Sequence, residues 1–416
     1  MAIPARTRRI LAQILSSESL ERIQTEAAKA AHRLGRHDHV IRFFHDPRSP
    51  MSWLMAQALL QLQLAYDVTI IGHTLLPRKL NDASMIADHG PQGVAEAGLV
   101  AAWFGLKAPE RAPYRAEIET VAAELLAKEG SNEWLESAVN LGLATFCSTS
   151  VPETFQDLSG VARNHVLLQQ LGHRRGGTIF LNGMWFEEVD GVLRVQEHLE
   201  KLGAIGAPLL RTHAEAMPSL PERELRFWFR LSDPYCYLAF KQLDAMSVRH
   251  QLDVKLLPAE SLLENDELSI RRQATAMMEV GREARRLHIP FGKAPGAEPT
   301  ADLKLWEVFY GLSNDPEAQR QLVHNAFYAL WVKGTNLNDL GAQLALAASV
   351  GVSESKATKW MLNHEASALI HENTQDLLDR SGRHHLPTTQ LGDRLFVGHQ
   401  RFELIDALFS ERSKRR

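Results

Sequence analysis

The sequence predicts an α/β fold that occurs twice in one chain. Residues 43–54 (FFHDPRSPMSWL) align without a gap with residues 227–238 (FWFRLSDPYCYL), 184 positions further on. Residues 176–186 (GGTIFLNGMWF) align with residues 386–396 (LPTTQLGDRLF), 210 positions further on. In each half an apolar strand leads into a helix that begins at a proline, and another strand follows near the end of the half.

The composition is that of a globular protein. A chain of 416 residues is long enough for two or three domains, and 45% hydrophobic residues can build a normal core. The formal charge of -4 argues against nucleic acids and anionic membranes as main partners. No apolar run reaches the roughly 18–20 residues of a membrane helix. We therefore expect neither a nucleic-acid nor a membrane partner.

The cysteine content favours a reducing compartment. The chain has two cysteines, Cys147 and Cys236, which cannot form a disulfide framework. The arginines near the N-terminus are followed by only a short apolar stretch, residues 10–15, which is poor as a secretory signal. We expect a cytoplasmic protein. The histidines lack the spacing with acidic or cysteine residues that is typical of a metal site, so no metal is expected.

The first half can be divided into elements by its hydrophobic pattern. Residues 1–36 read as an amphipathic helical lead, with Ser17 as a helix N-cap. The first domain is predicted over residues 37–202. Its expected elements are a strand at 40–44, a helix from Pro50, a strand at 68–71, helices within 110–172, a hairpin around Asn182-Gly183 and a helix over 192–202.

The second half repeats this plan after a connector. Residues 203–222 hold three prolines and few bulky residues, which is typical of a linker. The second domain is predicted over residues 223–416. Its expected elements are strands at 225–229 and 254–257, a helix from Pro234, helices within 265–380, a hairpin over 388–396 and a helix over 402–409. The second half is longer by 26 residues (210 minus 184), and we expect them in its helical part.

Each first strand is followed by a helix start that could bind an anion. Ser49 precedes Pro50, and Asp233 precedes Pro234. Serine and aspartate are good N-caps, and proline is favoured at the first helical position, so both pairs can be read as ordinary caps. The exposed N–H groups and the dipole of the same helix start would also favour an anion, and would lower the pKa of a thiol held there.

Redox thioredoxin-type proteins place the motif C-x-x-C across this turn. The two turns here read Ser49-Pro50-Met51-Ser52 and Asp233-Pro234-Tyr235-Cys236. A dithiol cycle needs an attacking and a resolving thiol, so neither half can run one alone. Cys236 stands where the resolving cysteine would be, or is a small buried residue of the first helical turn.

A proline in the second half is a candidate cis residue. Leu386-Pro387-Thr388 enters a strand near a chain reversal, where cis prolines occur. In thioredoxin-type folds such a proline faces the helix start, and the residue before it offers its backbone to an extended peptide. The first half has Gly176-Gly177-Thr178 at the matching positions.

These segments resemble one known family. The second half is similar to the 2-hydroxychromene-2-carboxylate isomerase and kappa-class glutathione transferase group, within the DsbA-like thioredoxin superfamily. The resemblance lies in segments 227–240, 281–292, 325–337, 386–389 and 396–402, and for the first half in segments 49–54 and 176–199. It implies an α/β protein of two thioredoxin-like domains, each with a helical insertion.

The resemblance also implies glutathione as the cofactor. In this group a serine of the turn hydrogen-bonds the glutathione thiol, and Ser49 matches it, whereas Asp233 departs from it. A carboxylate there would raise the pKa of a bound thiol, act as a general base or cap the helix. The other residues expected at the site are Asp190 and the pair Gln400-Arg401 for the γ-glutamyl end, Leu386 and Pro387, and an apolar wall of Met51, Trp53, Tyr235 and Tyr237.

Three functions are compatible with these residues. The first is a glutathione-dependent isomerase or transferase acting on a small aromatic or electrophilic substrate. The second is a thiol-disulfide oxidoreductase of DsbA type using Cys236, and the third is a non-catalytic binding protein with decayed sites. Because members of the group often dimerise, the resemblance implies either a homodimer or a pseudo-dimer of the two halves.

Overall fold

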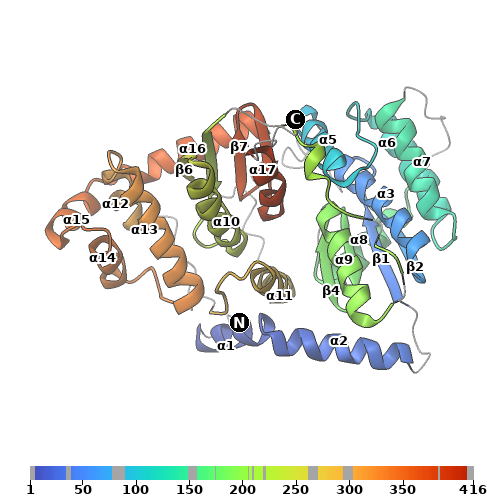
Figure 1. Cartoon of the computed structure of the whole chain (residues 1–416), viewed down its shortest axis with the longest axis horizontal. Helices are drawn as coiled ribbons and strands as arrows, with labels where there is room; N and C mark the ends of the chain where they lie inside the picture. The colour runs from blue at the N-terminus through green and yellow to red at the C-terminus, as the bar shows by residue number, and fades with distance from the viewer. Residues whose placement is uncertain are drawn as a thin grey trace, which may run out of the picture. The chain divides into compact units, whose positions relative to one another are not determined.

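The computed structural model of the chain describes residues 5–33, 39–76, 90–148, 157–173, 175–204, 206–208, 210–218, 222–260, 270–293, 303–382 and 385–409. The chain divides into two compact units (Figure 1). The N-terminal unit consists of Glu21–Leu220, Leu268–Thr275 and Leu404–Arg416, and the C-terminal unit consists of Met1–Leu20, Pro221–Glu267 and Ala276–Glu403. The structure is mixed α/β and has two four-stranded sheets.

The sheet of the N-terminal unit has the strand order β2-β1-β3-β4. Its strands are β1 (His39–His45), β2 (Val68–Thr74), β3 (Thr178–Leu181) and β4 (Met184–Glu187). β1 runs parallel to β2 and antiparallel to β3, which in turn is antiparallel to β4. A parallel pair needs a crossover connection, and α3 (Pro50–Ala65) supplies it.

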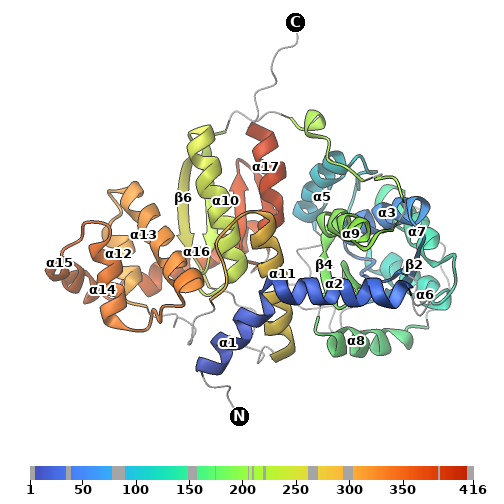
Figure 2. The ribbon, with the colours of Figure 1, turned by 60° about the horizontal axis from the view of Figure 1, so that its bottom comes forward.

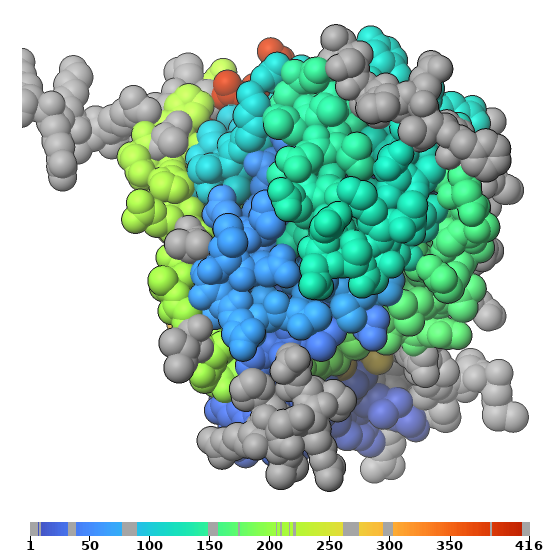
Figure 3. All heavy atoms as spheres, turned by 90° about the vertical axis from the view of Figure 1, so that its right-hand side faces the viewer, coloured from blue at the N-terminus to red at the C-terminus, as the bar shows by residue number. Residues whose placement is uncertain are grey.

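Helices cover both faces of this sheet. Successive strand residues point to opposite faces, so Phe43 and Phe44 of β1 pack against different helices. The Phe43 ring lies edge-on to Trp134 of α7 (Trp134–Cys147), whereas Phe44 clusters with Leu168 of α8 (Gly160–Leu171). α3 packs against α7, α5 (Pro91–Phe104) and α9 (Glu188–Leu202). α7 and α6 (Arg115–Ala127) form much of the surface seen in Figure 3.

The sheet of the C-terminal unit has the equivalent order, β6-β5-β7-β8. Its strands are β5 (Glu224–Phe229), β6 (Asp253–Pro258), β7 (Thr388–Leu391) and β8 (Arg394–Val397), and α10 (Pro234–His250) connects the parallel pair. The remaining helices are α11 (Ile270–Arg286), α12 (Leu305–Gly311), α13 (Pro316–Tyr328), the π-helical η3 (Ala329–Lys333), α14 (Leu340–Ala348), α15 (Glu354–Met361), α16 (Ala366–Ser381), the 3₁₀ turn η4 (His399–Arg401) and α17 (Phe402–Phe409). Helices α12 to α15 gather together in Figures 1 and 2.

The predicted strands are all present, and each helix that was expected at a proline begins there. From β1 to β5 the offset is 185 residues (39 to 224), and from β3 to β7 it is 210 (178 to 388). The additional residues of the second half therefore lie between β6 and β7, where α11 to α16 are found. One prediction was incomplete, because α5 lies before the helical stretch that was expected to begin at residue 110.

The N-terminal lead forms two helices where one was expected. α1 (Ala5–Leu15) and α2 (Glu18–Arg33) are separated at Ser16 and Ser17. Ser17 is the expected cap, since its Oγ accepts a hydrogen bond from the N–H of Leu20 at 3.3 Å. The described part of residues 203–222 contains one 3₁₀ turn, η2 (Ala214–Ala216), and one isolated bridge from Gly206 to Tyr66. No helix in the described ranges has the length and apolar character needed to cross a bilayer.

Candidate functional site

The helix start at Ser49 is built as a capped N-terminus. Ser49 has extended backbone angles, and its Oγ accepts a hydrogen bond from the N–H of Ser52 at 3.2 Å. Pro50 occupies the first helical position, where its missing N–H costs nothing. Ser49 is half-buried. A hydroxyl has one hydrogen and two lone pairs, so a serine that accepts from the backbone can still donate to a ligand.

Ser52 lies beneath this turn and is fully buried. Its Oγ is 3.0 Å from the backbone N of Asp46, which donates to it, and 2.8 Å from Nδ1 of His45. Burial lowers the pKa of His45 from 6.5 to about 4, although Asp46 and Ser52 act to raise it. His45 is therefore neutral near pH 7. The assignment that satisfies both groups has Ser52 donating its hydrogen to Nδ1 of His45.

The buried His45 should make the N-terminal unit sensitive to acid. Below pH 6.5 the unfolded chain binds a proton at this histidine while the folded chain does not, so stability falls as the pH falls from 6.5 to about 4. The full loss is about 3 kcal/mol. His45→Phe introduces the residue found at the matching position of the second half, Phe229. Urea unfolding between pH 7 and pH 4 should show a shallower pH dependence for this variant, and equal slopes would contradict the assignment.

An ion pair closes the loop between β1 and α3. Arg48 Nε and Nη2 donate to the two carboxylate oxygens of Asp46 at 2.9 and 2.6 Å, and the Arg48 N–H donates to the same carboxylate at 3.0 Å. Both side chains are buried. The pair fixes the backbone that leads into Ser49.

The loop before β3 approaches this turn through two glycines. A Cβ built on Gly177 would lie 3.7 Å from Cβ of Ser52, and one built on Gly176 would lie 2.7 Å from Cβ of Asp46. Gly177 has a φ of +71°, which strongly favours glycine. The structure thus places the loop of Gly176 and Gly177 against the Ser49–Ser52 turn.

The second turn is capped by a carboxylate. Asp233 Oδ1 accepts hydrogen bonds from the N–H of Tyr235 at 2.7 Å and of Cys236 at 3.4 Å. Cys236 is fully buried, and burial together with the Asp233 charge raises its pKa well above the usual value. A buried thiol with a raised pKa is a poor nucleophile. Cys236 was interpreted either as a resolving cysteine or as a small buried residue of the first helical turn. The geometry fits the second interpretation.

Ser52 and Cys236 occupy equivalent places. Each is the third residue of its helix, each is fully buried, and each accepts from the backbone N–H of the residue six positions earlier, Asp46 or Arg230. The Arg230 N to Cys236 Sγ distance is 3.4 Å. The position of the second cysteine of C-x-x-C is therefore structural in both halves.

The peptide bond between Leu386 and Pro387 is cis, as predicted. The carbonyl of Pro387 accepts from the N–H of Gly398 at 2.9 Å. In the first half the carbonyl of Gly177 accepts from Glu188 at 3.2 Å in the same way. Leu386 packs partly buried against a core cluster that contains Trp228.

The residues expected to form an apolar wall have different environments. Trp53 and Tyr237 lie in the core, where Trp53 Nε1 donates to the Val139 carbonyl and Tyr237 Oη donates to the Pro290 carbonyl. The expectation that these two rings line an open site is therefore corrected. Both belong to helix faces that pack against the inserted helices. Met51 and Tyr235 are half-buried, one beside each turn.

Two polar residues near the second turn, Glu279 and His399, were not predicted. Tyr235 Oη donates to Oε2 of Glu279 at 2.6 Å, and the Tyr235 ring lies 5.1 Å from the ring of His399. Glu279 and His399 are buried. Glu279 and His399 are thus polar neighbours of the second turn, as His45 is of the first turn. No spacing in the sequence links Glu279 of α11 to Tyr235, because the contact depends on how the insert folds back.

The residues expected to hold the γ-glutamyl end lie in the first turn of α9 and just before α17. Asp190 is in the first turn of α9 and is half-buried. Gln400 and Arg401 lie in η4, just before α17, and Arg401 is one of the largest fully buried side chains. The carbonyl of His399 accepts from Nε2 of Gln242, which ties η4 to α10. Among the described residues no group of three or more metal-ligating side chains is placed to hold an ion.

Comparison with known proteins finds a family match for part of the chain. Residues 224–410 match the model described as DSBA-like thioredoxin domain. A solved 2-hydroxychromene-2-carboxylate isomerase aligns at 18% identity over 44% of this chain and 93% of its own, with a TM-score of 0.40. The cytosolic disulfide reductase DsbM from Pseudomonas aeruginosa aligns at 20% identity over 42% and 88%, with a TM-score of 0.34. A structure of DsbM with GSH aligns at 18% identity over 42% and 88%, with a TM-score of 0.30.

No curated protein sequence matches the chain. The cis proline, the β6-β5-β7-β8 sheet and the capped start of α10 all lie within the matched range. Residues 224–410 are therefore a DsbA-like thioredoxin domain.

Proposed function

We propose that the chain is a tandem pair of such domains, over residues 37–202 and 223–416, joined by the linker 203–222. The equivalent strand order of the two sheets, the serine and aspartate caps and the matched Ser52 and Cys236 support this proposal. The carbonyl bonds of Gly177 and Pro387 add a fourth correspondence.

We further propose that the N-terminal unit binds glutathione and that the protein is a glutathione-dependent isomerase or transferase. The observation that carries this proposal is the geometry of Ser49. Its Oγ takes the cap hydrogen bond from Ser52, so its own hydrogen is left to donate to a sulfur placed above the start of α3. A thiolate there would also face the positive end of the helix.

The reaction follows from a thiolate held in this way. The sulfur adds to an electrophilic carbon of a small, aromatic or otherwise electrophilic substrate. In a transfer the new carbon–sulfur bond stays and a leaving group departs with its electrons. In an isomerisation the bond breaks again and glutathione is returned. A glutathione-dependent enzyme suits the cytoplasm, where thiols are kept reduced.

The Asp233 turn suits this chemistry less well. An ionised carboxylate only accepts hydrogen bonds, and Asp233 accepts two from the backbone of α10. Its negative charge would repel a thiolate and raise the pKa of the thiol. We assign Asp233 to capping, and expect the first half to carry the activity.

The oxidoreductase alternative leads to a separate prediction. Cys236→Ala should leave glutathione-dependent turnover of an electrophile within about twofold, because a buried thiol of raised pKa does not reach substrate. The change truncates a small core side chain and should cost about 1 kcal/mol of stability. Turnover of an aryl halide and reduction of a glutathione mixed disulfide would be measured in parallel. Loss of both activities in Cys236→Ala would favour the oxidoreductase.

The direct test of the proposed function is turnover of an aryl halide with glutathione by the full chain. Activity that needs glutathione, survives Cys236→Ala and falls in Ser49→Ala supports the proposal. Absence of activity together with absence of glutathione binding would leave the non-catalytic binding protein.

A further inference from the structure

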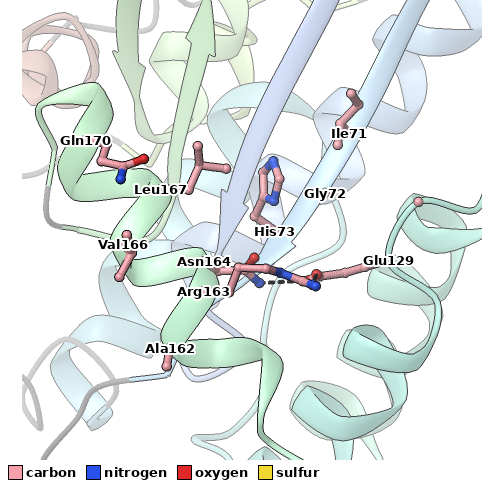
Figure 4. A pocket seen from close by; sticks show the side chains of 11 residues that line it. Ile71, Gly72, His73, Glu129, Ala162, Arg163, Asn164, Val166, Leu167 and Gln170 are labelled. Atoms are coloured by element: carbon pink, nitrogen blue, oxygen red, sulfur yellow. Dashed lines mark hydrogen bonds and ion pairs between the residues drawn. The ribbon is translucent and has the colours of Figure 1, made fainter.

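The N-terminal unit contains a cleft away from the Ser49 turn. Its volume is about 660 Å³, within the range of ligand pockets. Figure 4 shows α8 on one side of it and the C-terminal half of β2 on the other. The residues that line it are Ile71, Gly72, His73, Glu129, Gly130, Ala162, Arg163, Asn164, Val166, Leu167 and Gln170. None belongs to the Ser49–Ser52 turn or to the Gly176-Gly177 loop.

β2 is an edge strand, and its outer backbone groups face this cleft. The N–H of Thr74 donates to Glu129 at 2.8 Å, and the carbonyl of Thr74 accepts from Asn164 at 2.9 Å. The next residue, Leu75, bonds to β1 on the opposite side, through the His45 carbonyl. Because backbone groups alternate along a strand, the N–H and C=O of Gly72 point outward like those of Thr74. Within the described ranges no group hydrogen-bonds them.

The side chains at Thr74 take the place of a neighbouring strand. Glu129 supplies an acceptor for the Thr74 N–H, and Asn164 supplies a donor for its carbonyl. The two are held together by a hydrogen bond of 2.6 Å, and Arg163 donates to the second oxygen of Glu129 at 2.9 Å. Asn164 is 1% exposed. This built wall ends the edge at Thr74 and leaves Gly72 as the next open pairing position.

Among the residues that line the cleft, Arg163 is an exposed cation. The Arg163 side chain is 73% exposed although it contacts Glu129, so most of its donors are free to meet a ligand. Arg42 Nη1 lies 3.3 Å from Nε2 of His73. Burial and the nearby Arg42 lower the pKa of His73 to about 4, so this ring is neutral near pH 7. Glu129 is already paired with Arg163 and Asn164, so the exposed Arg163 guanidinium is the group in the lining that suits a carboxylate.

We propose that this cleft binds an extended peptide segment that carries a carboxylate. The peptide main chain would pair with the N–H and C=O of Gly72, as in recognition by strand addition, and the carboxylate would contact Arg163. Ile71, Val166 and Leu167 supply an apolar surface for its other side chains. Helix α8 lies beside the edge and forms the opposite wall of the cleft. This site uses no residue of the proposed glutathione site.

The test uses a pool of acetylated, amidated random pentapeptides that each contain one glutamate. Members retained by the immobilised full-length protein would be sequenced, and their affinities measured by fluorescence polarisation. Arg163→Ala should weaken binding about tenfold, as expected for loss of a charge-assisted hydrogen bond. Arg115→Ala is the matched control, because Arg115 is 68% exposed and paired with Glu119 at 3.1 Å on another helix. It should bind like the unchanged protein.

A change in the peptide tests the main-chain pairing without altering the fold. N-methylation at alternate positions removes the donors that face β2, whereas the same modification shifted by one residue removes donors that face solvent. Methylation of the amides that face β2 should abolish binding, and methylation of the amides that face solvent should preserve it. The proposal is overturned if no pentapeptide is retained, if both patterns bind equally, or if Arg163→Ala binds unchanged. If sedimentation shows that the unchanged protein is a dimer and that Arg163→Ala is a monomer, the cleft would instead bind a second copy of the chain.

Discussion

Replacing Ser49 with alanine should raise the pKa of glutathione bound to the N-terminal unit by about 1–2 units. The change removes a hydrogen bond to a charged acceptor, which contributes about 1.5–3 kcal/mol. Less thiolate is then present near neutral pH, and turnover of an electrophile should fall roughly 10- to 100-fold. The thiolate fraction can be followed by its ultraviolet absorbance as the pH is raised.

Two further variants separate this effect from helix capping. Ser49→Ala also removes the bond to the N–H of Ser52, at a cost of about 0.5–2 kcal/mol in stability. Ser49→Thr keeps a hydroxyl and should keep activity. Ser49→Asp introduces the cap of the second half, so it should preserve stability and still lose activity. Equal turnover in Ser49→Asp and the unchanged protein would contradict the assigned role of Ser49.

Replacing Asp46 with alanine should destabilise the N-terminal unit by about 3–5 kcal/mol. Asp46 accepts three hydrogen bonds from Arg48, and the two side chains are only 9% and 6% exposed. Without Asp46 the Arg48 guanidinium is left buried without its partner. Hydrogen exchange of the β1 and β2 amides measures the opening free energy of this unit separately from the other.

The double variant Asp46→Ala/Arg48→Met is the control for this prediction. It removes both charges, and replacing a buried ion pair by apolar residues is often neutral. We therefore expect it to recover most of the lost stability. The structure indicates a desolvated ion pair. A loss of stability of less than about 1 kcal/mol in Asp46→Ala would contradict this, because it is the value of a solvent-exposed pair.

The order of the elements could be predicted because each depends on local signals. Ser49-Pro50 and Asp233-Pro234 carry both the cap and the fixed first helical residue, and α3 and α10 begin there. Short apolar runs placed the strands, and Asn182-Gly183 placed a hairpin turn. The gapless alignment of two groups of these signals, at offsets of 184 and 210 residues, indicated that the second half repeats the plan of the first. α5 was missed because Gly90, Pro91 and Gly93 at its start resemble a loop.

The surroundings of the turns depend on contacts between distant segments. The sequence left open whether Cys236 is buried and gave no signal for Ser52, and the structure shows both side chains fully buried. The alignment of FFHDP with FWFRL could have drawn attention to His45, a histidine that aligns with the apolar Phe229 of the second half. Glu279 reaches Tyr235 from 44 residues away, through an insert whose path the sequence does not specify.

Calorimetric titration of the full chain with glutathione, in two buffers of different ionisation enthalpy, tests the central claim most directly. A free thiol has a pKa near 8.5, so a site that holds the thiolate must release a proton when glutathione binds at pH 7. We predict binding with proton release in the unchanged protein and in Cys236→Ala, and loss of the proton release in Ser49→Ala. Absence of binding, or binding with no proton released, would contradict the proposal that Ser49 activates glutathione.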